Sequence, residues 1–250
     1  MTQSWDPKRY DKNARFVSDL GAPVLALLNP QPGERILDLG CGDGPLTQQL
    51  VNLGCDVLGI DASPEQIEAA QKLGLSAQVM DGHDLPFEQE FDAVFSNATL
   101  HWLTRPDEVL AGVYKSLKPG GRFVAEFGGD GNVATVVAAV TQVLAARGID
   151  SAEHNPWYFP SVNEYRERLE AHNFDVHSIE LIDRPTPIPG DIAGWLETFA
   201  ESFLVAVPVS ERAVLLDELR ECLRPDLCDA SGNWTVDYVR LRFAAGKQSD

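Results

Sequence analysis

Residues 36–44 are Ile36-Leu37-Asp38-Leu39-Gly40-Cys41-Gly42-Asp43-Gly44, a short apolar run that ends in a cluster of glycines. Leucines then recur at helical spacing over residues 46–53, and Gly54 follows them. This order predicts a buried strand, a tight turn and an amphipathic helix. Such a strand-turn-helix unit is the start of an alternating α/β fold.

The same alternation continues toward the C-terminus. Ser63 and Gln66 form a capping box with a proline between them, which predicts a helix that runs to about Gly74. Another helix has its apolar face within residues 109–117. Further strands are predicted over residues 56–60, 77–80, 91–95 and 122–127. Apolar strands that alternate with amphipathic helices predict a doubly wound, Rossmann-like α/β fold with a mostly parallel seven-stranded sheet.

Beyond residue 128 the pattern is less regular. A helix is predicted near 132–147, and a second capping box, at Ser161 and Glu164, begins a helix that is followed by a strand near 174–183. Apolar residues at helical spacing over 189–228 predict two or three helices inserted before a last strand at about 234–244.

Composition excludes several classes of function. At 250 residues with 44% hydrophobic side chains, the chain is long enough to bury a sizeable core. Its net charge of −18 disfavours nucleic acid as a partner, because binding to phosphates requires clustered Lys and Arg. No apolar run approaches the roughly 20 residues of a membrane helix, so we expect no membrane partner and a cytoplasmic location. The four cysteines lack CxxC spacing, so we expect reduced thiols and no metal site.

The glycine turn is the expected ligand site, because ligands of open α/β sheets bind where the first strand passes into its helix. Asp61 is predicted to end the second strand, where a carboxylate accepts hydrogen bonds from a ribose diol in nicotinamide enzymes and other nucleotide-binding proteins. The glycines at 40, 42 and 44 miss the GxGxxG spacing, and a pyrophosphate fits poorly beside Asp38. A cofactor that carries an ammonium and a sulfonium fits this loop better.

Five motifs, in the right order over residues 36–127, resemble those of class I S-adenosylmethionine-dependent methyltransferases. They are residues 36–44 for the first motif, Gly59-Ile60-Asp61-Ala62-Ser63 for the ribose-binding second, Met80-Asp81-Gly82 for the adenine-contacting third, Phe91-Asp92-Ala93-Val94-Phe95-Ser96-Asn97 for the fourth, and Leu117-Lys118-Pro119-Gly120-Gly121-Arg122-Phe123 for the turn into the fifth strand.

The resemblance implies S-adenosylmethionine as the cofactor and assigns its contacts. The implied contacts, from the methionine end to the adenine, are Asn97, Asp38, Gly40, Cys41, Gly42, Asp61, Ala62, Asp81 and Gly82. Asp61 is assigned to the ribose and Asp81 to the adenine amino group. Tyr10 and Arg15 are placed in an N-terminal helix across the cofactor, where Arg15 pairs with the cofactor carboxylate. An aspartate after a strand is also a common turn residue, and Arg15 also suits an exposed helix face, so these alternatives stay open.

Within this superfamily, Trp5-Asp6-Pro7, residues 10–16 and residues 97–103 resemble the trans-aconitate methyltransferase-like group, which implies a cap over the methyl donor. The chain departs from that group at His101, where the trans-aconitate enzymes carry glutamine. The predicted parts are an N-terminal helical segment covering the cofactor (1–30), the cofactor-binding core (31–188), a helical cap insertion (189–230), and the last strand of the core with the tail (231–250).

The identity of the methyl acceptor decides what His101 does. Methyl transfer from a sulfonium is an in-line displacement that depends on holding the nucleophile against the methyl carbon. A carboxylate is already anionic, whereas a phenol, alcohol or protonated amine needs a base, and His101 is the candidate catalytic residue for that role. The alternative is a structural histidine that holds a helix N-terminus by a hydrogen bond.

Other residues are candidates for acceptor binding. Trp102, Trp157 and Tyr158 are expected to line the substrate pocket, with ordinary core packing as the alternative. Arginines in or beside the cap are candidates for orienting an acid, with solvent-exposed helix faces as the alternative; they are Arg184, Arg212, Arg220 and Arg224.

The leading hypothesis is a monomeric or homodimeric enzyme that methylates a small molecule, with O-methylation of a carboxylate favoured. The alternatives are an N-, C- or phenol O-methyltransferase with His101 as base, a non-catalytic S-adenosylmethionine-binding protein, and a nicotinamide-dependent oxidoreductase.

Overall fold

The computed structural model describes residues 21–249, which form two compact units. The larger unit contains residues 21–130, 158–182 and 240–249, and the smaller contains 131–157 and 183–239. The sheet has seven strands in the order β3-β2-β1-β4-β5-β7-β6. The predicted α/β fold with a mostly parallel seven-stranded sheet is confirmed.

Every helix and strand predicted beyond residue 35 is present. The strands are β1 (Arg35–Leu39), β2 (Asp56–Asp61), β3 (Ala77–Val79), β4 (Phe91–Asn97), β5 (Leu117–Gly128), β6 (Phe174–Pro187) and β7 (Thr235–Lys247). The helices are α2 (Ala22–Leu28), α3 (Pro45–Asn52), α4 (Pro64–Lys72), α5 (Pro106–Ser116), α6 (Ala134–Ala145), α7 (Val162–Ala171), α8 (Ile192–Phe199), α9 (Glu201–Leu204) and α10 (Arg212–Leu227). Short 3₁₀ turns span Leu100–Trp102, Ser151–His154 and Val209–Glu211.

Both predicted helix starts have the expected side-chain cap. The Ser63 hydroxyl accepts a hydrogen bond from the Gln66 N–H at 3.3 Å, and the Ser161 hydroxyl accepts one from the Glu164 N–H at 3.2 Å. Each bond satisfies one of the N–H groups that the first turn of a helix leaves without a partner.

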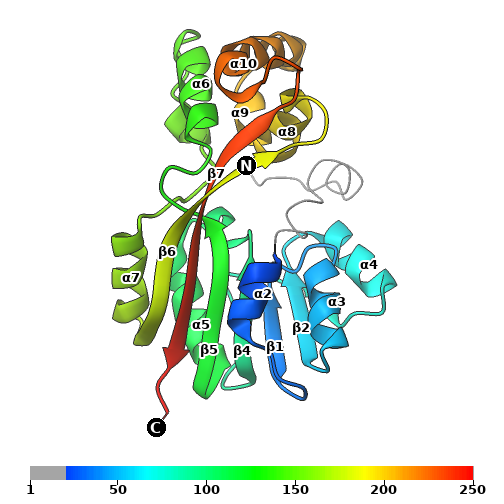
Figure 1. Cartoon of the computed structure of the whole chain (residues 1–250), viewed down its shortest axis with the longest axis vertical. Helices are drawn as coiled ribbons and strands as arrows, with labels where there is room; N and C mark the ends of the chain where they lie inside the picture. The colour runs from blue at the N-terminus through cyan, green and yellow to red at the C-terminus, as the bar shows by residue number, and fades with distance from the viewer. Residues whose placement is uncertain (1–20, 250) are drawn as a thin grey trace. The chain divides into compact units, whose positions relative to one another are not determined.

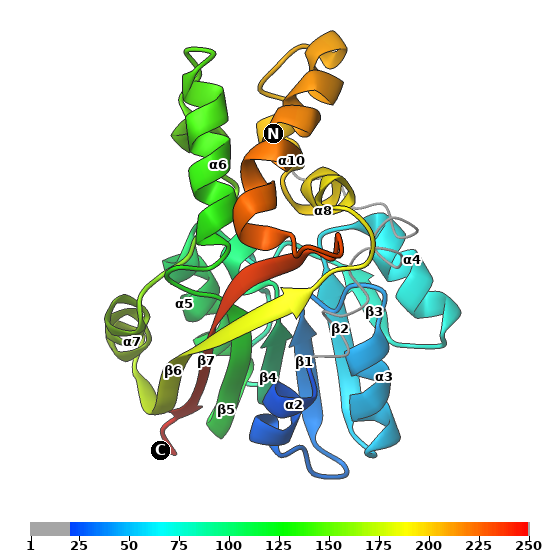
Figure 2. The same ribbon diagram turned by 45° about the horizontal axis from the view of Figure 1, so that its top comes forward.

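The parallel strands place their carboxyl ends at one edge of the sheet. β1 pairs in parallel with β2 on one side and with β4 on the other, and β4 pairs in parallel with β5. Figure 2 shows the arrowheads of β1 and β4 at this common edge. β7 runs antiparallel to β5, which is visible in Figure 1 as an arrow of opposite direction. Residues that follow β1, β2 and β4 therefore meet at the same edge.

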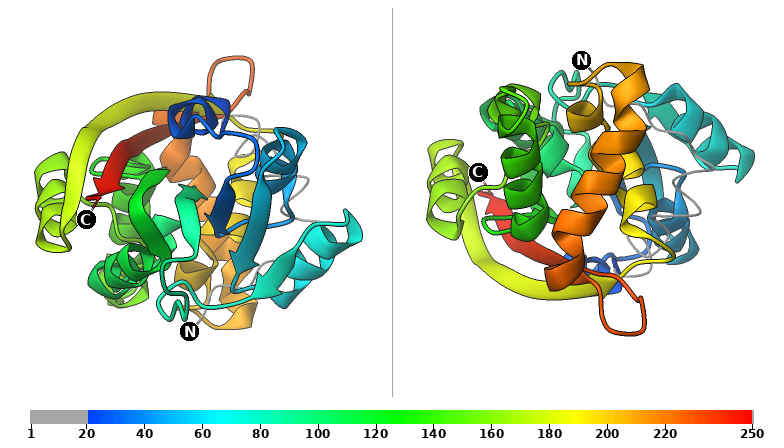
Figure 3. Two further views of the ribbon diagram at one scale, coloured as in Figure 1. Left: turned by 90° about the horizontal axis from the view of Figure 1, so that it is seen from below. Right: turned by 90° about the horizontal axis from the view of Figure 1, so that it is seen from above.

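Helices cover each face of the sheet, which explains why the central strands β1, β4 and β5 are largely buried on both sides. On one face, Val24 and Leu28 of α2 and Leu46 and Leu50 of α3 pack against a cluster that includes Phe95. On the other face, the cluster contains residues of α5 and α7. Figure 3, seen from below, shows α2 and α5 on opposite sides of the sheet.

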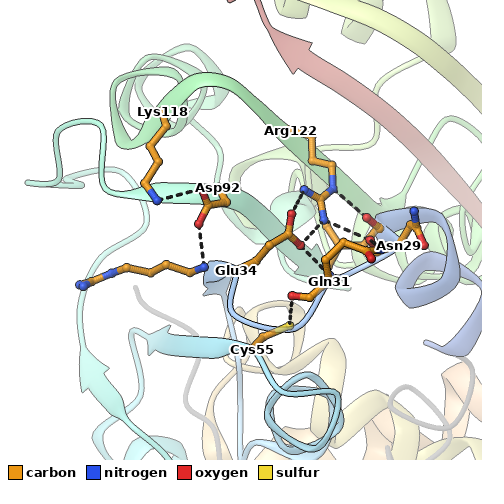
Figure 4. Close-up of polar contacts among 9 residues, drawn as sticks. Asn29, Gln31, Glu34, Cys55, Asp92, Lys118 and Arg122 are labelled. Carbon is orange, nitrogen blue, oxygen red and sulfur yellow. Dashed lines mark hydrogen bonds and ion pairs between the residues drawn. The ribbon is translucent and has the colours of Figure 1, made fainter.

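Arg122 anchors α2 to the amino end of the sheet (Figure 4). Its guanidinium donates to both carboxylate oxygens of Glu34 at 2.8 and 2.7 Å and to the carbonyl of Leu28 at 2.8 Å. The hydrogen bond from Arg122 lowers the pKa of Glu34. Carbonyls at the end of α2 thus receive donors that the helix itself cannot supply.

The smaller unit has its own aromatic core. The ring of Trp195 lies 5.2 Å from that of Phe199 and 6.4 Å from that of Trp157, and its indole N–H donates to the Tyr238 hydroxyl at 2.6 Å. This unit also takes in residues 131–157, which the sequence-based division assigned to the cofactor-binding core. None of the helices within residues 21–249 is long and apolar enough to span a bilayer.

Candidate functional site

The glycine loop after β1 is held by β2 and by the loop after β4. The N–H groups of Gly40 and Cys41 both donate to the carbonyl of Ile60, at 2.8 and 2.9 Å. Gly40 has φ +79°, and a Cβ added there would collide with the side chain of Thr99. The Thr99 hydroxyl in turn donates to the Gly40 carbonyl at 3.2 Å. Only glycine fits this position, both for its backbone angle and for its close neighbour.

Asp61 ends β2 directly beside this loop. One carboxylate oxygen accepts from the Gly42 N–H at 3.1 Å, and the other accepts from the Ser63 N–H at 2.9 Å. Burial raises the pKa of Asp61, and the N–H groups of Ser63, Gly42 and Ala62 oppose that rise. A carboxylate has about four acceptor positions, so acceptor capacity remains for a ligand after these contacts. Ala62 itself is exposed.

Asp38 is a second carboxylate on the same edge, and it is buried. It is 2% exposed and accepts from the Thr47 hydroxyl of α3 at 2.7 Å. Burial raises the pKa of Asp38 to about 7, the Thr47 hydrogen bond lowers it, and the charge of Asp61 raises it further. Within residues 21–249, neither carboxylate forms an ion pair. A buried carboxylate and a half-buried one beside a glycine turn fit a ligand that brings positive charge and hydroxyl donors.

Asp81 and Gly82 follow β3 and lie in a turn. Asp81 is exposed, and one of its oxygens accepts from the backbone N–H of His83 at 2.9 Å and contacts the His83 ring at 2.7 Å. Burial by itself would raise the pKa of Asp81, but the hydrogen bonds from His83 outweigh it and lower the pKa. A Cβ on Gly82 would lie 2.9 Å from Leu103 and 3.0 Å from Leu39. Asp81 therefore makes the contacts of a turn residue, which is the alternative that the sequence left open. A role for Asp81 at the adenine remains a proposal.

Asn97 is the last residue of β4 and pairs with Glu126 of β5. The preceding residue, Ser96, is fully buried and donates to the Leu39 carbonyl at 2.8 Å, which ties the end of β4 to the end of β1. Ala98 follows with φ +57°, an unusual conformation for a residue with a side chain. Because β3 pairs in parallel with β2, the turn at Asp81 also follows a strand at this edge. The larger unit therefore brings all the predicted cofactor contacts from Asp38 to Asn97 to one edge of the sheet, where the side chain of Asp81 is exposed.

His101 is buried, with 6% of its surface exposed. Its Nδ1 accepts from the backbone N–H of Gly128 at 3.2 Å, so the neutral ring carries its proton on Nε2. Burial lowers the pKa of His101 well below its usual value, and the charge of Arg240 lowers it further. A ring whose acceptor nitrogen is engaged and whose protonation is disfavoured suits a positioning role better than that of a general base.

The three aromatic candidates for the acceptor pocket have different surroundings. The Trp157 ring is buried and lies 5.4 Å from Phe203 within the smaller unit. Tyr158 is half-buried, and its hydroxyl donates to Glu164 of α7 at 2.8 Å. Trp102 is half-buried, with its ring 5.2 Å from that of His101. The contacts of Trp157 and Tyr158 favour the packing alternative, so Trp102 is the aromatic candidate that we retain.

The arginines predicted to orient an acid are engaged in part by neighbouring carboxylates. Arg220 lies 2.9 Å from Asp191, and Arg224 lies 3.2 Å from Glu221, both within the smaller unit.

Tyr10 and Arg15 lie outside the described residues. The sequence did not single out Thr47 and Thr99, which hold Asp38 and the glycine loop. Each lies in an element next to the loop, but an isolated threonine carries no motif by which to find it.

A relative that aligns over almost the full length of this chain identifies its family. An uncharacterized methyltransferase of Schizosaccharomyces pombe is 41% identical over 259 aligned positions, which cover 98% of each chain. This chain belongs to the methyltransferases. The family model described as "Methyltransferase domain" matches residues 37–125, which contain the glycine loop and the ends of β1, β2 and β4. S-adenosylmethionine is its methyl donor, and the nicotinamide alternative is wrong.

Two further similarities bear on the methyltransferase. A trans-aconitate 2-methyltransferase of Mycobacterium tuberculosis is 32% identical over 148 residues, which cover 57% of this chain and 55% of the relative. The fold matches that of phosphoethanolamine N-methyltransferase 2 of Haemonchus contortus, solved with phosphomonomethylethanolamine and S-adenosylhomocysteine, with a TM-score of 0.56 at 19% identity. That match covers 93% of this methyltransferase and 53% of the other chain.

Proposed function

We propose that this methyltransferase esterifies a carboxylate of a small organic acid. The observation that carries the proposal is the state of His101, whose Nδ1 accepts from Gly128 and whose pKa is lowered well below its usual value by burial. An acceptor that is already anionic at neutral pH needs no proton removed, so it suits a site whose candidate base is engaged. The local similarity to a trans-aconitate 2-methyltransferase supports the same class of acceptor.

In this proposal, residues of the larger unit hold the donor: Asp38 and the backbone of the glycine loop bind the methionine part, and Asp61 accepts from the ribose. The bound donor supplies a methyl group on a positively charged sulfur; when it passes to a carboxylate oxygen, the carbon–sulfur bond breaks and its electron pair stays on sulfur, leaving a neutral thioether. The chain's contribution is to hold the carboxylate in line with the methyl carbon and to exclude water.

A screen with S-adenosylmethionine tests the acceptor class. We expect S-adenosylhomocysteine to form with one or more mono-, di- or tricarboxylic acids, and mass spectrometry to show a product heavier by one methyl group. Mild base should hydrolyse that product back to the acid, because it is an ester. A base-stable product, or turnover with phenols or amines alone, would contradict the esterification proposal. His101 would then again be the candidate general base.

Replacing His101 by glutamine is a second test, since the amide oxygen can accept from the Gly128 N–H in place of Nδ1. We expect the variant to keep its maximal rate within about tenfold of the wild type, and both rates to be flat between about pH 6.5 and 8.5. The rate is measured at saturating donor and saturating acid. A loss of about 100-fold or more with unchanged S-adenosylhomocysteine affinity would instead identify His101 as a general base.

A further inference from the structure

Two arginines of β7 lie on the face of the sheet that carries the predicted methionine end of the donor site. In the β5–β7 register, Arg242 is opposite Glu126 and Arg240 is opposite Gly128. In the β4–β5 register, Glu126 is opposite Asn97. Residues opposite each other in a sheet, and residues two apart along a strand, share a face. The two arginines therefore project on the same side as Asn97, at the carboxyl ends of β4 and β5.

The same registers connect this row to Asp38. Phe95 of β4 is opposite Asp38 of β1 and, on its other side, opposite Val124 of β5. Asp38, Phe95 and Val124 thus lie on the face that carries Asn97 and Glu126. The carboxylate assigned to the methionine part and the two arginines occupy one face of one sheet, with β4 and β5 between them.

Both arginines are withdrawn from solvent. Arg240 is 7% exposed, and the Arg242 side chain is 16% exposed. Oε2 of Glu126, which is 2% exposed, accepts from Nε of Arg242 at 2.7 Å and lies 2.6 Å from a terminal nitrogen of the same guanidinium. Two nitrogens held at one carboxylate oxygen restrict the orientation of the guanidinium and leave its other terminal nitrogen outside the pair. Arg240 lies two positions from Arg242 on the same face, in a chain whose net charge is −18.

We propose that Arg240 and Arg242 bind the carboxylate of the methyl acceptor, and that Glu126 positions Arg242 for this contact. This inference rests on the proposed function and names the residues that serve it. Each guanidinium presents donors in a planar fork that matches a carboxylate. The arginines lie about 7 Å apart along β7 and two strand spacings of about 4.8 Å from β4, distances that a small acid with one or more carboxylates spans.

Arg240 also contributes to the state of His101. Burial is the main reason that the protonated ring is disfavoured, and the positive charge of Arg240 adds to it, so the histidine stays neutral and does not compete with the guanidinium groups for the anion. A carboxylate held by the arginines keeps its charge for the same reason, since a nearby cation favours the ionised form. The arginines therefore bind the acid in the form that attacks the methyl carbon.

The test measures acid binding separately from donor binding and from turnover. Trans-aconitate, succinate, benzoate and, separately, inorganic phosphate are titrated calorimetrically into the wild-type protein saturated with S-adenosylhomocysteine. We expect at least one of the three acids to bind, and Arg240→Gln and Arg242→Gln each to weaken that binding about tenfold or more, since each removes charged hydrogen bonds. Arg240→Lys should retain part of the affinity, because it keeps the charge without the fork.

S-adenosylhomocysteine affinity serves as the fold control and should be unchanged in every variant. Arg35→Gln is the matched control, because Arg35 lies at the amino end of β1 and is ion-paired with Glu90. Should Arg242→Gln fail to fold, the double variant Glu126→Gln with Arg242→Gln replaces it, because it removes the ion pair as a unit.

The outcomes separate this inference from the proposed function. Acids that bind the wild type and Arg240→Gln equally would overturn the inference and leave esterification intact. Acid binding that depends on Arg240 without ester formation would contradict the proposed function alone. Binding of inorganic phosphate but of none of the three acids would reassign the arginines to a phosphate-bearing acceptor and overturn the carboxylate assignment. Binding of neither phosphate nor acid, with S-adenosylhomocysteine bound normally, would overturn it outright.

Discussion

Replacing Asp61 by alanine is expected to weaken S-adenosylhomocysteine binding about 100-fold or more. The carboxylate makes two kinds of contact that alanine removes. It holds the glycine loop by accepting from Gly42 and Ser63, and its remaining acceptor positions are assigned to the ribose. Hydrogen bonds to a charged group contribute about 1.5–3 kcal/mol each, and every 1.4 kcal/mol is tenfold in affinity, so the loss of two gives about this change.

Calorimetric titration measures the affinity, and two further variants show what is lost. Asp61→Asn keeps an acceptor of the same size but not the charge, and it should fall between the wild type and Asp61→Ala. Asp56→Ala is the matched control, because Asp56 is exposed at the other end of β2. An Asp61→Ala protein that binds S-adenosylhomocysteine within about threefold of the wild type would remove Asp61 from the donor site.

The positions of the glycine loop and Asp61 could be predicted because the residues that indicate them lie close together in the sequence. A strand, a positive-φ turn and a helix start follow one another within residues 36–45, and the glycines there have the angles that the turn requires. Asp61 ends the adjacent strand, and parallel pairing brings that end beside the loop. Local pattern and strand order together were sufficient to place them.

The state of His101 could not be predicted from its neighbours in the sequence. Its hydrogen-bond donor is Gly128 at the end of β5, burial is the main cause of its lowered pKa, and the charge of Arg240 of β7 lowers the pKa further. The position of Arg240 depends on how β7 enters the sheet, antiparallel to β5, and no sequence motif predicts that arrangement. The sequence therefore left base and structural roles equally open, whereas the buried ring favours one of them.

The arginines illustrate the same limit. Sequence reasoning looked to the cap region for cations, because helices before the last strand resemble a lid over the donor. Arg240 and Arg242 lie within the last strand itself, two positions apart. Only the register of β7 against Glu126 and Gly128 shows which face of the sheet they share with the donor site. A period-two pair of arginines that alternates with the apolar residues Val239, Leu241 and Phe243 is the signal that was available.

Donor binding is also expected to strengthen as the pH rises toward 7 and to level off above it. Burial raises the pKa of Asp38 to about 7, so the unliganded protein holds a proton there at lower pH. A ligand that carries an ammonium favours the carboxylate form, so its binding below pH 7 must release that proton. The affinity for S-adenosylhomocysteine should then rise about tenfold per pH unit well below pH 7, because one proton is released for each ligand bound.

The stability of the unliganded protein should change in the opposite direction. A carboxyl group whose folded pKa lies above its unfolded value contributes stability that is present below the unfolded pKa and is lost as the pH rises through the folded pKa. For Asp38 this window extends from about 4 to about 7. The bound donor offsets the cost of the buried charge, so its effect on the unfolding temperature should be larger at pH 8 than at pH 5.

Asp38→Asn isolates this group from Asp61, whose pKa is also raised by burial. The amide still accepts from the Thr47 hydroxyl but does not titrate, so the variant should bind more weakly above pH 7 and lose most of the pH dependence. Titrations at each pH in two buffers with different ionisation enthalpies report the protons released per ligand. Release of one proton at pH 5.5 from the wild type and of almost none from Asp38→Asn would assign the titrating group to Asp38, whereas equal release from both would assign it to Asp61.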